Sequence, residues 1–185
     1  AHEDEKFEAT LNLINLSFNS CILLIGDSLQ RHTIAIDKKE DADFFYDLSV
    51  QEGNKWLQRN EKFFSKLKNL VKIIRWDTWL NHRNFSTQKN TVLTLIKNDI
   101  SYRTSFDNTI NLFLRKFCQH IKNPETIDLQ RAYHLCMNYL VEESTALCLW
   151  PELNCHFDLY PALRNQAMKH TYEQFVFPSY PQLLH

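Results

Sequence analysis

Apolar residues form one uninterrupted run near the start of the chain and several shorter runs later. The run 21–26 ends in a glycine, which is typical of a buried central strand in a parallel sheet. Shorter runs rich in aromatic or β-branched residues predict four more strands, and proline follows two of them. These predicted strands are 43–47, 71–76, 155–160 and 174–177.

Between these runs, apolar residues recur at helical spacing, which predicts helices at 3–17, 50–70, 105–122 and 126–149. Strands that alternate with helices favour an α/β fold built on a parallel sheet. The segment 29–42 is short for a crossover helix, which leaves two interpretations open: a mobile loop, or a connection that has lost residues.

Composition narrows the class of protein. The 185 residues suit a single domain, 1–185, with 44% hydrophobic and 23% charged residues and a net charge of −1. Five cysteines without C-x-x-C spacing argue against a disulfide framework or a zinc site. Two glycines cannot build a dinucleotide fingerprint or a phosphate loop. We therefore expect no cofactor and no metal.

The same features bear on location and assembly. No signal-peptide pattern is visible, and the longest apolar run is too short to span a membrane. Free cysteines fit a reducing compartment. We expect a cytoplasmic monomer without membrane contact.

Ser28 follows the predicted strand 21–26 by two residues, in the stretch Gly26-Asp27-Ser28-Leu29. Ligands of parallel α/β sheets bind at the carboxyl ends of strands, so Ser28 is well placed to act as a nucleophile. The alternative is that Ser28 only caps the helix that follows.

Tyr139 and Glu143 are four positions apart on the predicted helix 126–149 and share a face, with Ala146 among their apolar neighbours. A half-buried carboxylate beside a phenol can hold an ammonium group or move a proton. The alternative is a solvated glutamate and a core tyrosine. Tyr160 and Pro161 end a predicted strand, which would bring Tyr160 to the same edge as Ser28, or simply terminate the strand.

Basic residues recur on the helix 50–70, opposite its apolar side. They are spaced four, three and four positions apart, at Lys55, Arg59, Lys62 and Lys66. Such a stripe on a nearly neutral protein can follow a phosphate backbone, or it can be an ordinary solvated face.

Taken together, these blocks resemble the tRNA-dependent cyclodipeptide synthase family. The resemblance rests on Gly26-Asp27-Ser28, on the helical Asn-Tyr-x-x-x-Glu block from Asn138 to Glu143, on Tyr160-Pro161, and on the endings Phe175-Val176-Phe177-Pro178 and Pro181-Gln182-Leu183. The blocks occur in order over nearly the whole chain. Arg31, three residues after Ser28, together with Tyr160-Pro161, resembles the family branch that lacks an asparagine at the Arg31 position.

The resemblance implies a Rossmann-like, three-layer parallel sheet, similar to the catalytic domain of class I tyrosyl- and tryptophanyl-tRNA synthetases. It implies a ping-pong reaction in which Ser28 takes an aminoacyl group from one aminoacyl-tRNA and a second aminoacyl-tRNA supplies the next residue. The ribose hydroxyl beside the tRNA ester would shuttle the proton.

The resemblance also assigns residue roles. Tyr139, Glu143 and Tyr160 would join Ser28 in catalysis, and Lys55, Arg59, Lys62 and Lys66 would hold tRNA. The residues implied for the aminoacyl pocket are Gly26, Arg31, Phe45, Ala146, Asp158 and Pro161.

Two rival functions remain. Gly26-Asp27-Ser28-Leu29 spells the motif of GDSL-type serine esterases, but the Asp-x-x-His pair that such enzymes need does not occur in this sequence. A non-catalytic RNA-binding module would explain the basic stripe, but not the set formed by Ser28, Tyr139, Glu143 and Tyr160.

Overall fold

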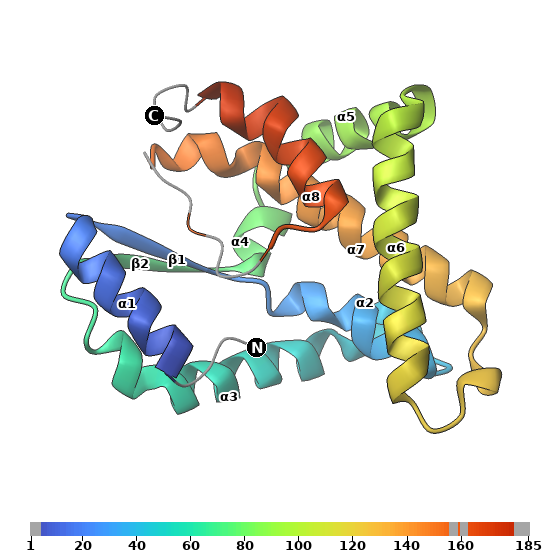
Figure 1. Ribbon diagram of the computed structural model, residues 1–185, viewed down its shortest axis with the longest axis horizontal. Coiled ribbons are helices and arrows are strands. Elements are labelled where there is room, and N and C mark those ends of the chain that lie inside the picture. Colours follow the sequence, from blue (N-terminus) through green and yellow to red (C-terminus); the bar gives the residue numbers. More distant parts are fainter. Residues whose placement is uncertain (1–4, 156–158, 160–162, 180–185) are drawn as a thin grey trace.

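The computed structural model describes residues 5–155, 159 and 163–179. A parallel sheet and helix α1 (Glu5–Ser17) lie at one end of the molecule, with helix α3 (Tyr46–Phe64) beside them, as Figure 1 shows. At the other end, α6 (Ile100–His120) crosses α7 (Leu129–Leu149). Short helical turns connect the two ends of the molecule. Most of the described residues lie in helices or helical turns.

The sheet has two strands among the described residues, β1 (Cys21–Ile25) and β2 (Leu70–Arg75). They pair in parallel, with Ile25 opposite Arg75, and helix α3 provides the crossover between them. Both strands were predicted: β1 is an apolar run, and β2 is a short run rich in β-branched residues. The result is a helix-rich α/β fold around a small parallel sheet, and the described residues do not form a three-layer sheet.

Two predicted strands are wrong. Residues 43–47 lie in a 3₁₀ turn (Ala42–Phe45) and in the start of α3, and residues 174–177 lie in a π-helical turn (Tyr172–Val176) and the 3₁₀ turn after it. Both runs are short and aromatic, which does not distinguish a strand from a buried helical turn. The predicted strand 155–160 lies largely outside the described residues.

The segment 29–42 is largely helical. A 3₁₀ turn (Ser28–Gln30), the short helix α2 (Arg31–Ile34) and a second 3₁₀ turn (Ala35–Asp37) follow one another. Arg131 of α7 donates hydrogen bonds to the carbonyl oxygens of Ala35 at 2.8 Å and Lys38 at 2.9 Å. These bonds tie the end of the segment to the central helix of the domain.

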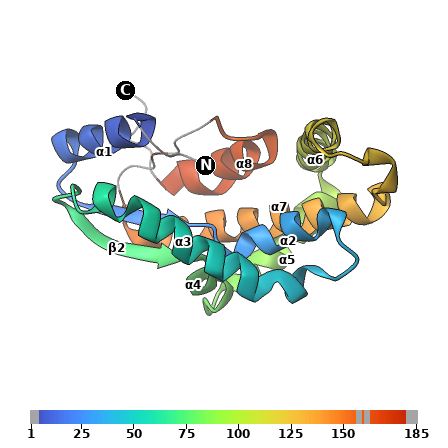
Figure 2. The ribbon, with the colours of Figure 1, turned by 90° about the horizontal axis from the view of Figure 1, so that it is seen from below.

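Helices α4 (Trp76–Leu80) and α5 (Phe85–Asn98) were not predicted, whereas α1, α3, α6 and α7 were. Figure 2 shows α7 passing between α6 and α8 (Gln166–Thr171) on one side and α5 on the other. Asp99, Asp128 and Asn165 each accept a hydrogen bond from a backbone N–H three residues ahead and so cap the helices α6, α7 and α8. Within the described ranges, no helix is long and apolar enough to cross a membrane.

The core consists of several apolar clusters. The largest lies between α5, α6 and α7, and a second joins the strand ends to α7 through Ile74, Trp76, Trp79 and Ala146. A third packs α1 against the end of α3. The second cluster surrounds the carboxyl ends of both strands, which is where the predicted site lies.

Gly53 allows α3 to lie against the end of the sheet. A Cβ atom at this position would lie 2.6 Å from the Cβ of Asp27 and 3.2 Å from an Nη atom of Arg75. Contacts under 3 Å force atoms to move, and the Asp27 Cβ is fixed to the backbone. Any larger residue at position 53 would therefore push α3 away from the strand ends.

We predict that Gly53→Ala destabilises the protein. Overpacking of this kind costs about 1–3 kcal/mol and the gain in helix propensity is at most about 1 kcal/mol, so the expected net loss is up to about 2 kcal/mol. Urea unfolding measures the change. Gly26→Ala is the matched control, because its added Cβ would lie 3.8 Å from the Trp76 ring and 3.9 Å from the Leu29 side chain, which are ordinary contact distances. Equal stability of the two variants would contradict the close approach of α3.

Candidate active site

Ser28 lies just beyond the carboxyl end of β1, at the first position of a 3₁₀ turn. Its side chain is buried, and its Oγ donates a hydrogen bond of 2.6 Å to Oδ1 of Asp77. No side-chain cap is formed at this turn. The hydroxyl is therefore directed at a carboxylate rather than at the backbone of the helix that follows, which argues against the cap interpretation.

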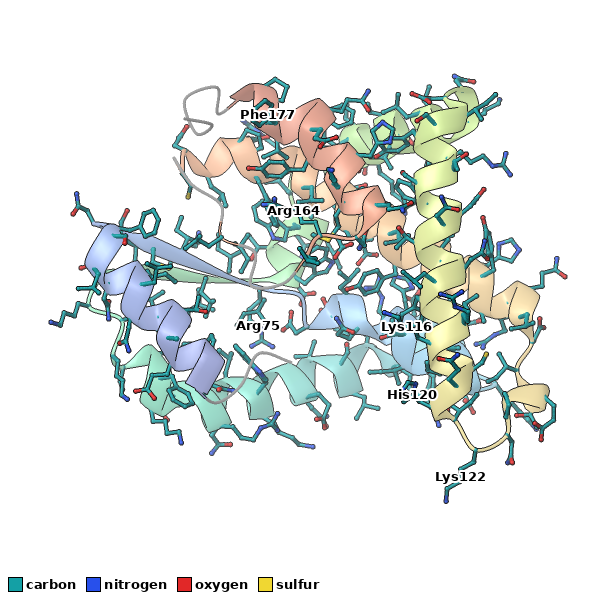
Figure 3. All side chains as sticks on the ribbon, viewed as in Figure 1. Arg75, Lys116, His120, Lys122, Arg164 and Phe177 are labelled. Atoms are coloured by element: carbon teal, nitrogen blue, oxygen red, sulfur yellow. The ribbon has the colours of Figure 1, made fainter. Side chains whose placement is uncertain are left out.

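Asp27 joins the ends of the two strands. One carboxylate oxygen accepts a hydrogen bond of 3.1 Å from the backbone N–H of Trp76, and the other is bound by Arg75. Arg75 lies between the sheet and α3 in Figure 3, and it also donates to Oδ1 of Asn54 at 2.8 Å. This set of bonds holds residues 26–28 against residues 75–77.

Asp77 accepts two hydrogen bonds, one on each carboxylate oxygen. The second comes from the hydroxyl of Tyr46, the first residue of α3. The bond to Asp77 and partial burial raise the pKa of Tyr46 to about 12. Tyr46 therefore remains a protonated donor at neutral pH, and it orients the carboxylate that holds Ser28.

A buried ion pair lies behind Ser28. The guanidinium of Arg31 donates to both carboxylate oxygens of Glu142, at 2.9 and 2.7 Å, and to the carbonyl oxygen of Ser28 at 2.9 Å. Nε2 of His32 lies 3.3 Å from Oε2 of Glu142, and the indole N–H of Trp76 donates a hydrogen bond of 2.8 Å to Oε1 of Glu142. Glu142 thus links α7 to both segments that follow the strands.

Glu142 and Glu143 are neighbours on α7, but their pKa values are shifted in opposite directions. Burial alone would raise the pKa of Glu142, but hydrogen bonds from His32 and Arg31 outweigh it and lower the pKa to about 2. Burial raises the pKa of Glu143 to about 7, against the smaller effect of a hydrogen bond with Asn165. Among the described residues, Oε2 of Glu143 has no hydrogen-bond partner. At neutral pH, Glu142 is a fixed anion and Glu143 is close to half protonated.

The structure places the remaining predicted residues unevenly. Tyr139 lies one turn before Glu143, and its hydroxyl accepts a hydrogen bond of 3.4 Å from Gln30, two residues after Ser28. Ala146 is buried in the cluster around Trp76. Phe45 is buried in the large cluster between the helices, while the adjacent Phe44 is 72% exposed. Tyr160, Asp158 and Pro161 lie outside the described residues.

The basic stripe is exposed along α3, as predicted, but Lys66 lies in the turn beyond the helix. Lys55 pairs with Glu52 at 2.7 Å and Lys66 pairs with Glu8. The ammonium of Lys62 lies 4.8 Å from the ring centre of Phe63. The stripe runs away from Tyr46, so it leads outward from the region of Ser28.

Asp77, Tyr46, Glu142 and Trp76 were missed as site residues. Asp77 could have been found, because it directly follows the predicted strand 71–76, and Ser28 likewise closely follows the predicted strand 21–26. Glu142 could not, since the sequence offers Glu142 and Glu143 side by side with nothing to show which one meets Arg31. Among the described residues, no group of three His, Cys, Asp or Glu side chains could hold a metal ion.

Comparison with solved structures identifies the family. The structure of a cyclodipeptide synthase (CDPS) from Fluoribacter dumoffii is 38% identical in sequence and superimposes with a TM-score of 0.92, covering 100% of this chain and 82% of that chain. This chain belongs to the cyclodipeptide synthase family. It is therefore an aminoacyltransferase that forms cyclic dipeptides from aminoacyl-tRNAs, and the esterase and RNA-binding alternatives fall away.

A second solved structure agrees in fold. The cyclodipeptide synthase from Candidatus Glomeribacter gigasporarum, bound to Phe-tRNAPhe, is 18% identical, with a TM-score of 0.78 over 98% of this chain and 78% of that one. No family model matches the sequence, and the search of curated proteins found no match.

We predict that Glu142→Gln destabilises this cyclodipeptide synthase at neutral pH. A fall in pKa from 4.5 to about 2 corresponds to about 3 kcal/mol of stability. Because the folded pKa is lowered, this contribution is present above pH 4.5 and disappears as the pH falls toward 2. The stability difference from wild type, measured by urea unfolding, should shrink over that range.

Glu143→Gln is the matched control for this prediction. The raised pKa of Glu143 means that ionisation opposes folding, so the control should gain stability relative to wild type as the pH rises from 4.5 to 7. Opposite signs for the two neighbouring variants are expected. A Glu142→Gln variant as stable as wild type at pH 7 would contradict the buried ion pair.

Proposed function

We propose that this cyclodipeptide synthase works by a ping-pong mechanism through an aminoacyl ester on Ser28. The observation that carries the proposal is the hydrogen bond from Ser28 Oγ to a carboxylate at the carboxyl ends of both strands. In the first half-reaction, Ser28 Oγ attacks the ester carbonyl of an aminoacyl-tRNA, and the bond to the ribose oxygen breaks. The tRNA leaves with its hydroxyl restored.

In the second half-reaction, the amine of the Ser28-bound residue attacks the ester of a second aminoacyl-tRNA. The new terminal amine then attacks the Ser28 ester and closes the ring, which frees the hydroxyl of Ser28. Each attack needs a neutral amine, so a nearby base must take a proton from the ammonium group. Two esters are consumed and two amide bonds form, so the reaction requires no further source of energy.

Glu143 fits the role of this base. It is buried, its pKa is about 7, and one of its oxygens has no partner among the described residues. A pKa near neutrality suits a group that must both accept and release a proton. Tyr139 lies one turn before Glu143 on α7, and its hydroxyl is hydrogen-bonded to Gln30 in the segment after Ser28, which supports a place for this face of α7 near the loaded serine. The roles predicted for Tyr160, Asp158 and Pro161 stay predictions.

Arg31 has a supporting role in this proposal. Its guanidinium donates both to the carbonyl oxygen of Ser28 and to the carboxylate of Glu142, which fixes the backbone of the nucleophile relative to α7. The side chain is fully engaged by these partners and by Asp43 at 3.3 Å. We infer that Arg31 positions the site and does not contact the aminoacyl group.

The exposed stripe on α3 supports an assignment as the tRNA surface. Helix α3 begins next to Asp77 and extends for 19 residues, which is about 28 Å at 1.5 Å per residue. Basic residues along this length could follow the phosphates of an acceptor arm whose aminoacyl end reaches Ser28. The neighbour from Candidatus Glomeribacter gigasporarum is bound to a charged tRNA, which agrees with such a surface.

The covalent intermediate can be tested directly. Incubation of the wild-type protein with aminoacyl-tRNAs that carry a radiolabelled amino acid should leave label on the protein, and Ser28→Ala should acquire none. Ser105→Ala is the control, because Ser105 is a buried serine of α6 whose hydroxyl donates to the carbonyl oxygen of Tyr102 in its own helix, at 2.6 Å. Label on Ser28→Ala, or none on wild type with any charged tRNA, would contradict the proposal.

The tRNA surface is tested by the double variant Arg59→Ala, Lys62→Ala. Loss of two phosphate contacts should weaken tRNA binding about tenfold or more, and the slope of log K against log salt should fall by about 1.4–1.8. The control is Lys89→Ala, Lys97→Ala, which removes two exposed charges from α5. Equal affinities and slopes for the two double variants would move the tRNA surface away from α3.

A further inference from the structure

A serine hydroxyl is a poor nucleophile at neutral pH and needs a base within hydrogen-bond reach. Among the described residues, the recorded side-chain partner of Ser28 Oγ is Asp77 Oδ1, at 2.6 Å. His32, the histidine nearest in sequence, lies against Glu142 instead. The chemistry of the loading step therefore points to a carboxylate and not to an imidazole.

We propose that Asp77 is a further catalytic residue, the base that takes the proton of Ser28 during loading. This proposal rests on the proposed function, since it concerns the first half-reaction. Ser28 Oγ gives its proton to Asp77 Oδ1 as it bonds to the ester carbonyl carbon. When the bond from that carbon to the ribose oxygen breaks, Asp77 returns the proton to that oxygen. The net products are an ester on Ser28, a free tRNA hydroxyl and an ionised Asp77.

Two other carboxylates in this region, Glu142 and Asp27, are engaged elsewhere. Glu142 is held by Arg31, His32 and Trp76, and its low pKa makes it a weak base. Asp27 is bound by Arg75 and by the backbone of Trp76. Asp77 differs from both, because its two recorded partners are neutral hydroxyl groups. No cation competes in these bonds for the oxygen that would receive the proton.

Tyr46 completes the arrangement as a positioning residue. Its hydroxyl binds the second oxygen of Asp77, so the first oxygen is left to face Ser28. A base that is itself oriented by a third group is the arrangement that activates serine in hydrolases, although here the residues differ. Ser28 lies in the turn after β1, Tyr46 is the first residue of α3, and Asp77 lies in the first turn of α4.

This proposal competes with transfer of the proton to the ribose hydroxyl beside the ester, which the family resemblance suggested. The two differ in a way that needs no protein variant. If Asp77 takes the proton, the wild-type protein should load from a 3′-aminoacyl-tRNA whose terminal ribose lacks the 2′-hydroxyl, with a rate within about tenfold of normal. A loss of more than 100-fold with this substrate would overturn the proposal.

The variant Asp77→Asn tests the carboxylate itself. Asparagine keeps the shape and can still accept the hydrogen bond, but it cannot take the proton. The rate of label transfer to Ser28 in a rapid-quench experiment should fall by about 10²–10⁴-fold, while the melting temperature and tRNA affinity stay unchanged. Tyr46→Phe should slow loading by a smaller factor. Asp47→Asn, an exposed acid beside Tyr46, should load at the wild-type rate.

The outcomes separate this proposal from the proposed function. If wild type forms no adduct, the ping-pong mechanism itself fails. If wild type forms the adduct and a folded Asp77→Asn forms it at the same rate, only the role of Asp77 fails. If Asp77→Asn does not fold, the tRNA that lacks the 2′-hydroxyl still decides the question with the wild-type protein.

Discussion

The parallel register of β1 with β2 places the residues that follow the two strands side by side. Ile25 lies opposite Arg75, so the chain leaves the sheet twice at the same edge. Asp27 then binds both Arg75 and the backbone of Trp76, which locks the two exits together. These bonds hold the two segments that follow the strands together, so that Ser28 after β1 can contact Asp77 after β2. Gly53 belongs to the same constraint, because any side chain there would separate α3 and Tyr46 from the exits.

Three acidic groups near this edge, and Glu143 next to one of them on α7, differ in what they contact and therefore in their roles. Asp27 and Glu142 meet cations and hold the site in shape. Asp77 meets two hydroxyl groups, one of which is the nucleophile. Glu143 is buried with one oxygen unpartnered among the described residues, and so its pKa rises toward neutrality. Adjacent residues on a helix point about 100° apart, which is why Glu142 and Glu143 can have opposite roles.

The sequence predicted those parts of the fold that depend on local pattern. The uninterrupted run predicted β1 and the apolar spacing predicted α6 and α7, and the structure contains all three elements, although in β1 only Ile25 is buried. Short aromatic runs failed at 43–47 and 174–177, because over four or five residues the strand and helix periods cannot be separated. The three-layer sheet, which the described residues do not form, was implied by the family resemblance and not by the sequence pattern itself.

Site residues were predictable where a strand end marks them. Ser28 follows this rule, and Asp77 follows it too, although it was not recognised. The clamp of Arg31 with Glu142 spans 111 positions and depends on how α2 meets α7, which no local pattern encodes. The position of Arg31 in the sequence suggested a variable residue near the nucleophile. Its geometry shows a guanidinium that binds the backbone of Ser28 and the central helix at once.

The central claim is that the ester on Ser28 is an intermediate and not a side product. A pulse-chase experiment tests it: the enzyme is first loaded with a labelled amino acid, then freed of tRNA, and then mixed in a rapid-quench apparatus with an excess of unlabelled aminoacyl-tRNA. The account predicts that label leaves Ser28 and appears in the cyclic dipeptide at the same rate, at least as fast as steady-state turnover. Label that remains on Ser28 while unlabelled cyclic dipeptide accumulates would contradict it.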